Sequence, residues 1–199
     1  MYRFGRPRRY PRRRFGYGSH SFLNDYIRLN KCKRIMEIGV ADGENAKEMV
    51  KVASEYFPAE EVEYYGFDTF GWGNDSQMEH VRQKLEEIGC QFKLFKGDSV
   101  ITLPKSVKGL PMMDLIFIDG GHYYTTVKSD WENSKSLMHE KTAVFFHNYD
   151  FSGPKRVVNN ISREEYQVEI IDPPLDSRTA LVKKKTRVRS KREGTLGLY

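Results

Sequence analysis

Short, nearly uninterrupted apolar runs alternate with amphipathic segments along the central part of this chain, and this alternation limits the fold more than any other feature. The runs predict strands at residues 34–39, 62–68, 92–96, 114–118 and 142–146. Strands that are apolar on both faces are typical of a parallel sheet covered by helices on each side. We therefore expect an α/β fold with a mostly parallel sheet.

The segments between the strands have helical spacing, and the end of the chain departs from the alternation. Helices are expected at residues 22–29, 46–56, 77–88, 127–138 and 153–161. Residues 166–171 and 179–184 look like two strands joined by a proline-containing turn, which predicts an antiparallel hairpin. The full expectation is a Rossmann-like, mostly parallel seven-stranded sheet that is flanked by helices and ends in this C-terminal antiparallel hairpin.

Charge is segregated along the chain. Residues 1–18 contain seven arginines and no acidic residue, whereas residues 183–199 contain seven lysines or arginines and one acidic residue. The whole chain has 33 basic and 27 acidic residues, so the centre contains 19 basic and 26 acidic residues. The net charge of the centre is therefore −7, and that of the two ends together is +13. We expect a flexible basic tail at 1–18, a folded domain at 19–184 and a basic tail at 185–199, with tails able to contact nucleic acid or an acidic surface.

Composition also limits the setting in which the chain works. It contains no run of about 18 apolar residues, so we expect no transmembrane segment. The arginine-rich start lacks the apolar region of a secretory signal. The two cysteines, Cys32 and Cys90, lack paired or metal-type spacing, which favours reduced thiols and a cytoplasmic location. The sequence leaves open whether the chain forms a homodimer.

Polar or glycine-rich clusters follow each of the first five predicted strands. In chain order they are EIGVADG at 37–43, GFDTF at 66–70, GDS at 97–99, DGGH at 119–122 and HNYD at 147–150. Each acid alone could be a helix cap or turn residue, and the histidine a hydrogen-bonded loop residue. The carboxyl ends of parallel strands lie at the same edge of a sheet, and ligands bind at that edge. Five such clusters together therefore predict one site. The first cluster lacks the Gly-x-Gly-x-x-Gly pattern of dinucleotide binders, which argues against an NAD-dependent enzyme.

The ordered pieces MEIGVADGENA, YYGFDTFGWG, FKGDS, DLIFIDGGHYYTTVKSDW and AVFFHNYD resemble the class I S-adenosylmethionine-dependent methyltransferases. More narrowly, they resemble the macrocin-type O-methyltransferases (methyltransferase family 24), whose relatives act on sugars of antibiotics and glycans. A more distant similarity is to the metal-dependent catechol O-methyltransferases. The resemblance runs from about residue 33 to 150, and the closing hairpin extends it to about 184. It implies an enzyme that methylates a hydroxyl of a sugar, a glycan or a small molecule.

The resemblance also implies roles for individual residues. The residues expected to bind S-adenosylmethionine are Glu37, Gly39, Gly43, Asp68, Thr69, Phe70, Asp98, Ser99 and Asp119. His122 occupies the position that carries the general base in the resembling families, and Asp119 is the second catalytic candidate. An imidazole, with a pKa of about 6.5, can accept the proton of an attacking hydroxyl at working pH. The aromatic residues Trp72, Tyr123, Tyr124 and Trp131 could form an acceptor wall, but the place of Trp131 inside a predicted helix favours core packing for that residue.

The metal-dependent relatives imply a Mg²⁺ ion bound by Asp119, Asn148 and Asp150, with His147 as a further candidate ligand. The families usually have an aspartate in the pair that follows the fifth strand, where this chain has His147-Asn148. Carboxylate and amide oxygens suit Mg²⁺, whereas an imidazole suits a softer metal. Whether a metal is required therefore stays open.

Two other functions remain in competition. Arginine interleaved with aromatic residues at the N-terminus suits RNA, so an RNA-directed methyltransferase is one alternative. The acidic centre and the lack of an Asn-Pro-Pro-Tyr motif argue against it. The second alternative is a binding module that keeps the fold without activity, which the His147-Asn148 departure mildly favours.

Overall fold

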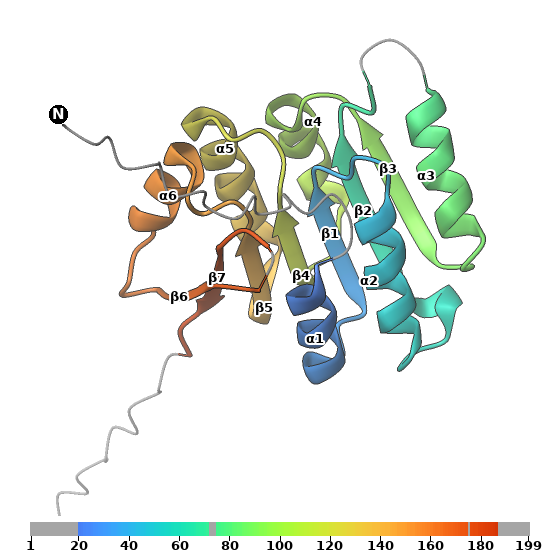
Figure 1. The fold of residues 1–199 in the computed structure, drawn as a ribbon, viewed down its shortest axis with the longest axis horizontal. Coiled ribbons are helices and arrows are strands. Elements are labelled where there is room, and N and C mark those ends of the chain that lie inside the picture. The colour runs from blue at the N-terminus through green and yellow to red at the C-terminus, as the bar shows by residue number, and fades with distance from the viewer. Residues whose placement is uncertain (1–19, 72–74, 175, 187–199) are drawn as a thin grey trace, which may run out of the picture.

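Helices and strands alternate much as the apolar pattern predicts, in a computed structural model that describes residues 20–71, 75–174 and 176–186 (Figure 1). The strands are β1 (Arg34–Ile38), β2 (Glu63–Asp68), β3 (Gln91–Lys96), β4 (Met113–Ile118), β5 (Met138–Phe146), β6 (Tyr166–Ile171) and β7 (Thr179–Lys184). The α-helices are α1 (Ser21–Asn30), α2 (Glu44–Ser54), α3 (Ser76–Glu86), α4 (Ser99–Ser106), α5 (Tyr124–Ser134) and α6 (Ser152–Asn159). The predicted tail at 1–18, most of the tail at 185–199 and Trp72 lie outside the described residues.

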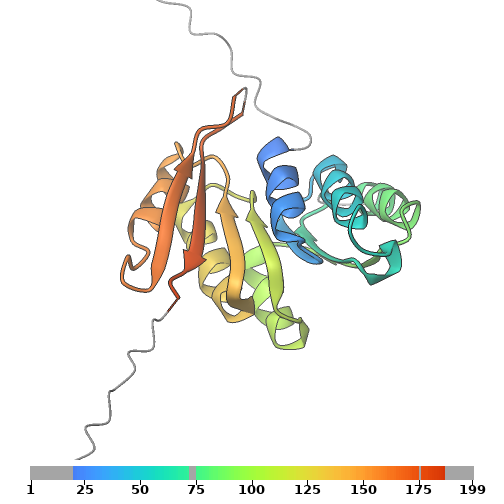
Figure 2. The ribbon, with the colours of Figure 1, turned by 90° about the horizontal axis from the view of Figure 1, so that it is seen from below.

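The seven strands form one sheet in the order β3-β2-β1-β4-β5-β7-β6. The first five strands run parallel to one another, and β7 runs antiparallel to both β5 and β6. The hairpin of β6 and β7 therefore closes one edge of the sheet beside β5 (Figure 2). This arrangement confirms the predicted fold class, including the antiparallel C-terminal hairpin.

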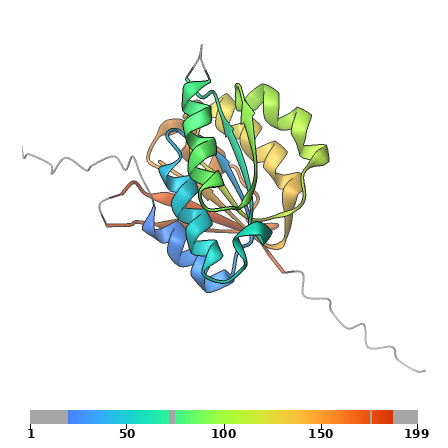
Figure 3. The same ribbon diagram turned by 90° about the vertical axis from the view of Figure 1, so that its right-hand side faces the viewer.

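Helices cover both faces of the sheet and create two apolar cores (Figure 3). One core joins α1, α2 and α3 to strand residues such as Ile35 and Phe117. The other joins α4, α5 and α6 to the neighbouring strand residues, such as Met36 and Ile116. Because successive strand residues point to opposite faces, a strand covered on both sides must be apolar throughout. Double coverage thus explains the uninterrupted apolar runs.

Helix α4 is the one α-helix among the described residues that the sequence pattern did not predict. It contains three β-branched residues, Val100, Ile101 and Thr102, and an internal proline, Pro104. All four residues have low helix propensity. The helix forms nevertheless, because the Asp98 side chain caps it by accepting a 2.9 Å hydrogen bond from the backbone N–H of Val100. Asp98 thus has a structural task in addition to any part in ligand binding.

The chain leaves the neighbouring strands β1 and β4 toward opposite faces of the sheet, into α2 and α5 respectively. Such a reversal opens a crevice at the carboxyl ends of the strands. The loops approach closely there: a Cβ atom on Gly39, whose φ is +92°, would lie 2.3 Å from the carbonyl oxygen of Asp119. Only glycine fits this position. Within the described ranges, no helix is long and apolar enough to cross a membrane.

Candidate active site

A cavity of about 790 Å³ opens at the carboxyl ends of the five parallel strands. It brings together residues that are far apart in the sequence and were predicted to share one site. The predicted residues that line it are Glu37, Gly39, Asp68, Thr69, Asp98, Ser99, Asp119, His122, Tyr123, His147 and Asn148. These residues therefore surround one cavity, and their roles in binding and catalysis remain predictions.

Other predicted site residues lie outside the cavity lining. Phe70 is fully buried in the core beside α2 and α3, and Trp131 packs edge-on against Tyr166 in the other core. Tyr124 begins α5 and lies under the guanidinium of Arg156. Their apolar surfaces are used in packing between elements, so none of the three is placed to form the predicted contact with a ligand.

Gly43 also lies just outside the lining. It is the N-cap residue of α2 in a left-handed conformation, with φ +79°. A Cβ atom there would lie 2.9 Å from the side chain of Val81. The second glycine of the first loop is therefore explained by the turn into α2 and by the close approach of α3.

Glu37 is buried at the base of the first loop. Its carboxylate accepts a 2.7 Å hydrogen bond from the side-chain amide of Asn45 and a second one from the hydroxyl of Tyr64. Burial penalises the charged form and raises the pKa of Glu37 to about 8, although both hydrogen bonds act in the opposite direction. At neutral pH this carboxyl group is therefore held largely in its neutral form.

Asp68 ties the loop after β1 to the end of β2. One of its carboxylate oxygens accepts hydrogen bonds from the backbone N–H groups of Val40 and Ala41, at 2.8 and 3.0 Å. The other accepts a 2.7 Å hydrogen bond from the backbone N–H of Phe70. The carboxylate thus fixes the shape of the glycine-containing loop while it also lines the cavity.

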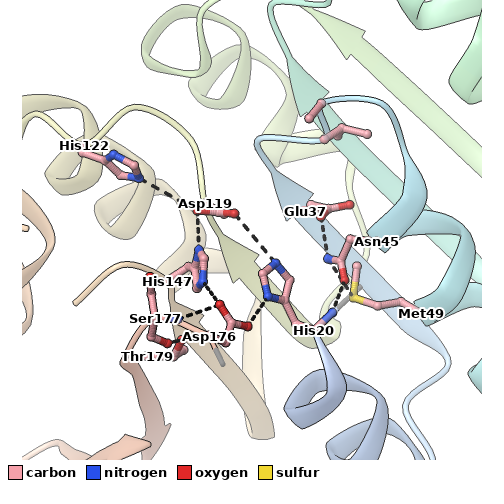
Figure 4. A network of polar contacts seen from close by, with 12 residues as sticks. His20, Glu37, Asn45, Met49, Asp119, His122, His147, Asp176, Ser177 and Thr179 are labelled. Atoms are coloured by element: carbon pink, nitrogen blue, oxygen red, sulfur yellow. Dashed lines mark hydrogen bonds and ion pairs between the residues drawn. The ribbon is translucent and has the colours of Figure 1, made fainter. Parts of the chain in front are cut away.

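A chain of alternating histidines and aspartates lies at the other end of the cavity (Figure 4). His147 lies between two carboxylates, with Nδ1 2.8 Å from Asp119 and Nε2 3.0 Å from Asp176. Asp176, in the turn of the β6–β7 hairpin, also contacts Nδ1 of His20 at 2.6 Å. Because His20 precedes α1, this network joins both ends of the described chain to the central strands.

The charges of this network support one another. Burial would lower the pKa of His147, but the hydrogen bonds to Asp119 and Asp176 outweigh burial and raise it to about 9. Burial would raise the pKa of Asp119, but the hydrogen bonds from His122 and His147 hold it below the ordinary value. The pKa of Asp176 is lowered for the same reason, by His147 and His20 against the effect of burial. Both aspartates are therefore ionised at neutral pH.

His122 lies at the rim of the cavity with 39% of its side chain exposed. Its ring stacks on Phe151, with centroids 4.7 Å apart, and its Nε2 atom is 3.9 Å from a carboxylate oxygen of Asp119. The contact with Phe151 limits the orientations of the ring. These are the conditions in which an accessible imidazole can accept a proton.

The predicted Mg²⁺ ligands are not assembled. Asp119 and Asn148 line the cavity, but Asp150 does not, and its carboxylate forms an ion pair with both Nε and Nη2 of Arg178. Arg178 therefore draws Asp150 toward the β6–β7 turn. The prediction of a metal site made of Asp119, Asn148 and Asp150 is not supported by this geometry, because one of its two carboxylates is already neutralised elsewhere.

Three polar residues of the site were missed by the sequence analysis: His20, Asn45 and Asp176. His20 directly follows a segment of low complexity, and Asp176 resembles an ordinary turn residue beside two prolines. Asn45 belongs to the first motif, and its place as the second residue of α2, within reach of Glu37, was the available signal. His20 and Asp176 contact each other across 156 residues, and Asp176 contacts His147 across 29, so local patterns carry no signal for them.

Comparison with known proteins agrees with the fold and the motifs. The sequence profile of a family described as a methyltransferase domain (methyltransferase family 24) matches residues 36–149. The chain belongs to this family, and the resemblance to the S-adenosylmethionine-dependent methyltransferases is confirmed. A comparison with curated protein sequences finds no significant match.

Solved structures with the same fold include several O-methyltransferases. TomG from Streptomyces achromogenes, solved with S-adenosylmethionine, has a TM-score of 0.68 at 16% identity, covering 83% of this chain and 78% of its own. CalS11, a TDP-rhamnose 3'-O-methyltransferase of calicheamicin biosynthesis, has a TM-score of 0.68 at 18% identity, covering 82% and 78%. An O-methyltransferase from Bacillus cereus, solved with SAH, has a TM-score of 0.65 at 14% identity, covering 82% and 79%. At these identities the similarity establishes the fold.

Proposed function

We propose that this chain transfers a methyl group from S-adenosylmethionine to a hydroxyl of a sugar, a glycan or another small molecule. The observation that carries the proposal is a single cavity that holds the loops expected to bind the cofactor and, at its rim, the candidate base His122. Structural relatives support the donor and the acceptor class, since TomG was solved with S-adenosylmethionine and CalS11 is named for a sugar substrate.

The charge of the cavity favours a cationic ligand. Among the described residues that line it are five acidic residues and neither a lysine nor an arginine; the acids are Glu37, Asp42, Asp68, Asp98 and Asp119. Glu37 is largely neutral until a bound cation stabilises its ionised form. S-adenosylmethionine carries a positive sulfonium and an ammonium group, which such a cavity attracts. A phosphate-rich acceptor would be repelled, so the lining argues against RNA as the group that enters the cavity.

The cofactor supplies a methyl group that its sulfonium already activates, so the protein has to position the reactants and remove a proton. Glu37 and Asn45 lie where the methionine part is expected, and Asp68, Asp98 and Ser99 where the adenosine is expected. Gly39 keeps the loop after β1 close to Asp119, which is expected beside the sulfonium. Each of these residues acts by holding the donor in one orientation.

His122 would accept the proton of the acceptor hydroxyl. As the oxygen–carbon bond forms, the sulfur–carbon bond breaks, and the hydroxyl proton passes to an imidazole nitrogen of His122. The resulting imidazolium lies close to the carboxylate of Asp119, whose charge stabilises it. Tyr123, with 79% of its surface exposed beside His122 at the cavity mouth, can cover an acceptor ring from outside.

The proposal is tested with methyl-labelled S-adenosylmethionine and a host extract divided into RNA, protein, glycan and small-molecule fractions. We expect label in the glycan or small-molecule fraction, in a form that resists the alkaline treatment that cleaves methyl esters. A variant with His122→Ala serves as the matched control, because it leaves the expected donor site intact. Label in RNA would overturn the acceptor class, and no label in any fraction would favour a binding module that has lost activity.

A further inference from the structure

Two histidines and one aspartate in the cavity form a group that can hold a metal ion. Ligand atoms of His20, Asp119 and His147 all lie within 4.8 Å of one another. His20 and His147 are almost completely buried, and all three residues line the cavity. This set differs from the oxygen ligands that relatives with Mg²⁺ imply, since Arg178 engages Asp150 and His20 was not among the expected ligands.

The orientation of the two imidazoles is the feature that favours a metal. Asp176 contacts one nitrogen of each ring, His20 Nδ1 at 2.6 Å and His147 Nε2 at 3.0 Å. The other nitrogens both face Asp119, with His147 Nδ1 at 2.8 Å and His20 Nε2 at 4.0 Å. A carboxylate that accepts a hydrogen bond from the outer N–H of each histidine and turns the inner lone pairs to one point is the usual second shell of a metal site.

Charge and geometry agree with a divalent ion. In the metal-bound form the imidazoles of His20 and His147 are neutral, so with Asp119 and Asp176 the four side chains carry a charge of −2, which one divalent cation would neutralise. The proton that His147 holds in the metal-free network would leave as the ion binds. Ligand atoms about 2.1 Å from a common ion lie at most about 4.2 Å apart, so side-chain shifts of roughly half an ångström would complete the set. The ring centroids of His20 and His147 are already 4.5 Å apart, so both imidazoles lie beside the same point next to Asp119.

We infer that His20, His147 and Asp119 bind a divalent first-row transition metal, with Asp176 as the carboxylate that orients both histidines. Two imidazoles and one carboxylate suit Zn²⁺, Fe²⁺, Co²⁺ or Mn²⁺, and the set discriminates against Mg²⁺, which prefers oxygen ligands. Three protein ligands leave further coordination positions, and these face the cavity in which the acceptor is expected. The inference stands apart from the proposed function, because it concerns metal binding and not methyl transfer.

The test titrates Co²⁺ and Zn²⁺ into the full-length, untagged, chelator-treated protein, with calorimetry for stoichiometry and the visible absorption of Co²⁺ for its ligands. We expect one tightly bound ion per chain and no displacement by an equal concentration of Mg²⁺. The two cysteines are poor competitors, because burial raises the pKa of Cys32 to about 12 and that of Cys90 to about 11.

Three variants make the test specific to these residues. His20→Ala and His147→Gln should each weaken Co²⁺ binding at least tenfold, and Asp176→Asn should weaken it by about 10- to 100-fold while keeping one site per chain. The matched control is His139→Ala, which removes a histidine that is paired with Asp114 at 3.0 Å at the opposite end of the strands. It should leave binding unchanged. Because His147 is buried, far-ultraviolet circular dichroism first establishes that each variant is folded.

Two results would overturn the inference. One is Co²⁺ binding that is equally tight in wild type and in folded His20→Ala. The other is the absence of stoichiometric binding in wild type, in which case the network is held by protons alone. Neither result bears on methyl transfer, so failure of the metal site and failure of the proposed function are separately visible.

Discussion

At the residue scale, Glu37 shows how burial prepares this site for a cationic ligand. Its carboxyl group is completely enclosed and has a pKa of about 8, against an ordinary value of 4.5. Because the folded-state pKa is raised, the stabilising contribution of the neutral form is complete below pH 4.5 and is lost as the pH rises through 8. A bound ammonium or sulfonium group would reverse this loss by stabilising the ionised form.

We therefore expect Glu37→Gln to remove much of the pH dependence of stability in the unliganded protein. Between pH 5 and 9 wild type should lose a few kcal/mol of unfolding free energy, on the order of 1.4 kcal/mol per unit of pKa shift, relative to the variant. Urea unfolding at several pH values measures this difference, with Glu48→Gln, whose side chain is 38% exposed, as control. If the unfolding free energies of wild type and Glu37→Gln change with pH in parallel, the pKa of Glu37 is not raised in the folded protein.

The site was predictable from the sequence only as far as local motifs reach. Glu37, Asp68 and Asp119 follow apolar strands, and strand ends converge in a parallel sheet, so their proximity could be inferred. His20 and Asp176 have no such relation to a strand end of the parallel sheet. Their positions depend on how α1 and the β6–β7 hairpin pack, which is set by tertiary contacts and not by a sequence pattern.

At the scale of elements, the fold depends on the tight approach of the loops after β1 and β4. Most strands were predicted to within two residues, because double burial leaves a plain apolar signal; β5 begins four residues earlier than expected. Helix α4 was not predicted, because its residues have low helix propensity. It forms because Asp98 caps it and because it packs on the sheet. The glycines separate two physical effects that the sequence alone does not distinguish, namely a positive φ and a lack of space.

Three alanine substitutions should separate these effects. Gly109 has neither a positive φ nor a neighbour within 4 Å of a Cβ atom, Gly89 has φ +83° but open space, and Gly39 has φ +92° and a contact at 2.3 Å. We expect little change for Gly109→Ala, a loss of about 1–2 kcal/mol for Gly89→Ala, and a larger loss with impaired cofactor binding for Gly39→Ala. Thermal unfolding and calorimetry check the order. Equal losses for Gly39→Ala and Gly89→Ala would contradict the close approach.

At the scale of the whole molecule, an acidic body is joined to strongly basic ends. The lining of the cavity, as far as the structure describes it, is acidic as well and includes no lysine or arginine. Their charge predicts a separate capacity to bind polyanions, whose strength should depend steeply on salt. Catalysis and tethering would then be independent functions of one chain.

Replacing the seven arginines of residues 1–18 by serine should therefore weaken binding to single-stranded RNA and flatten its salt dependence. Replacing them by lysine is the control, since it keeps the charge and removes only the planar guanidinium groups. Fluorescence anisotropy at several salt concentrations measures both variants, and methyl transfer to a small acceptor should be unchanged in each. RNA affinity that survives the serine substitutions would show that the N-terminal arginines are not the tether.

The measurement that tests the central claim most directly is the rate of methyl transfer by His122→Ala to the acceptor found in the fractionated extract. With the donor saturating, we expect turnover to fall by about 10²- to 10⁴-fold, while the affinity for S-adenosylmethionine stays within about twofold of wild type. His139→Ala, a histidine paired with Asp114 outside the cavity, should keep full turnover. Full turnover by folded His122→Ala would show that the proton leaves by another route and that His122 is not the base.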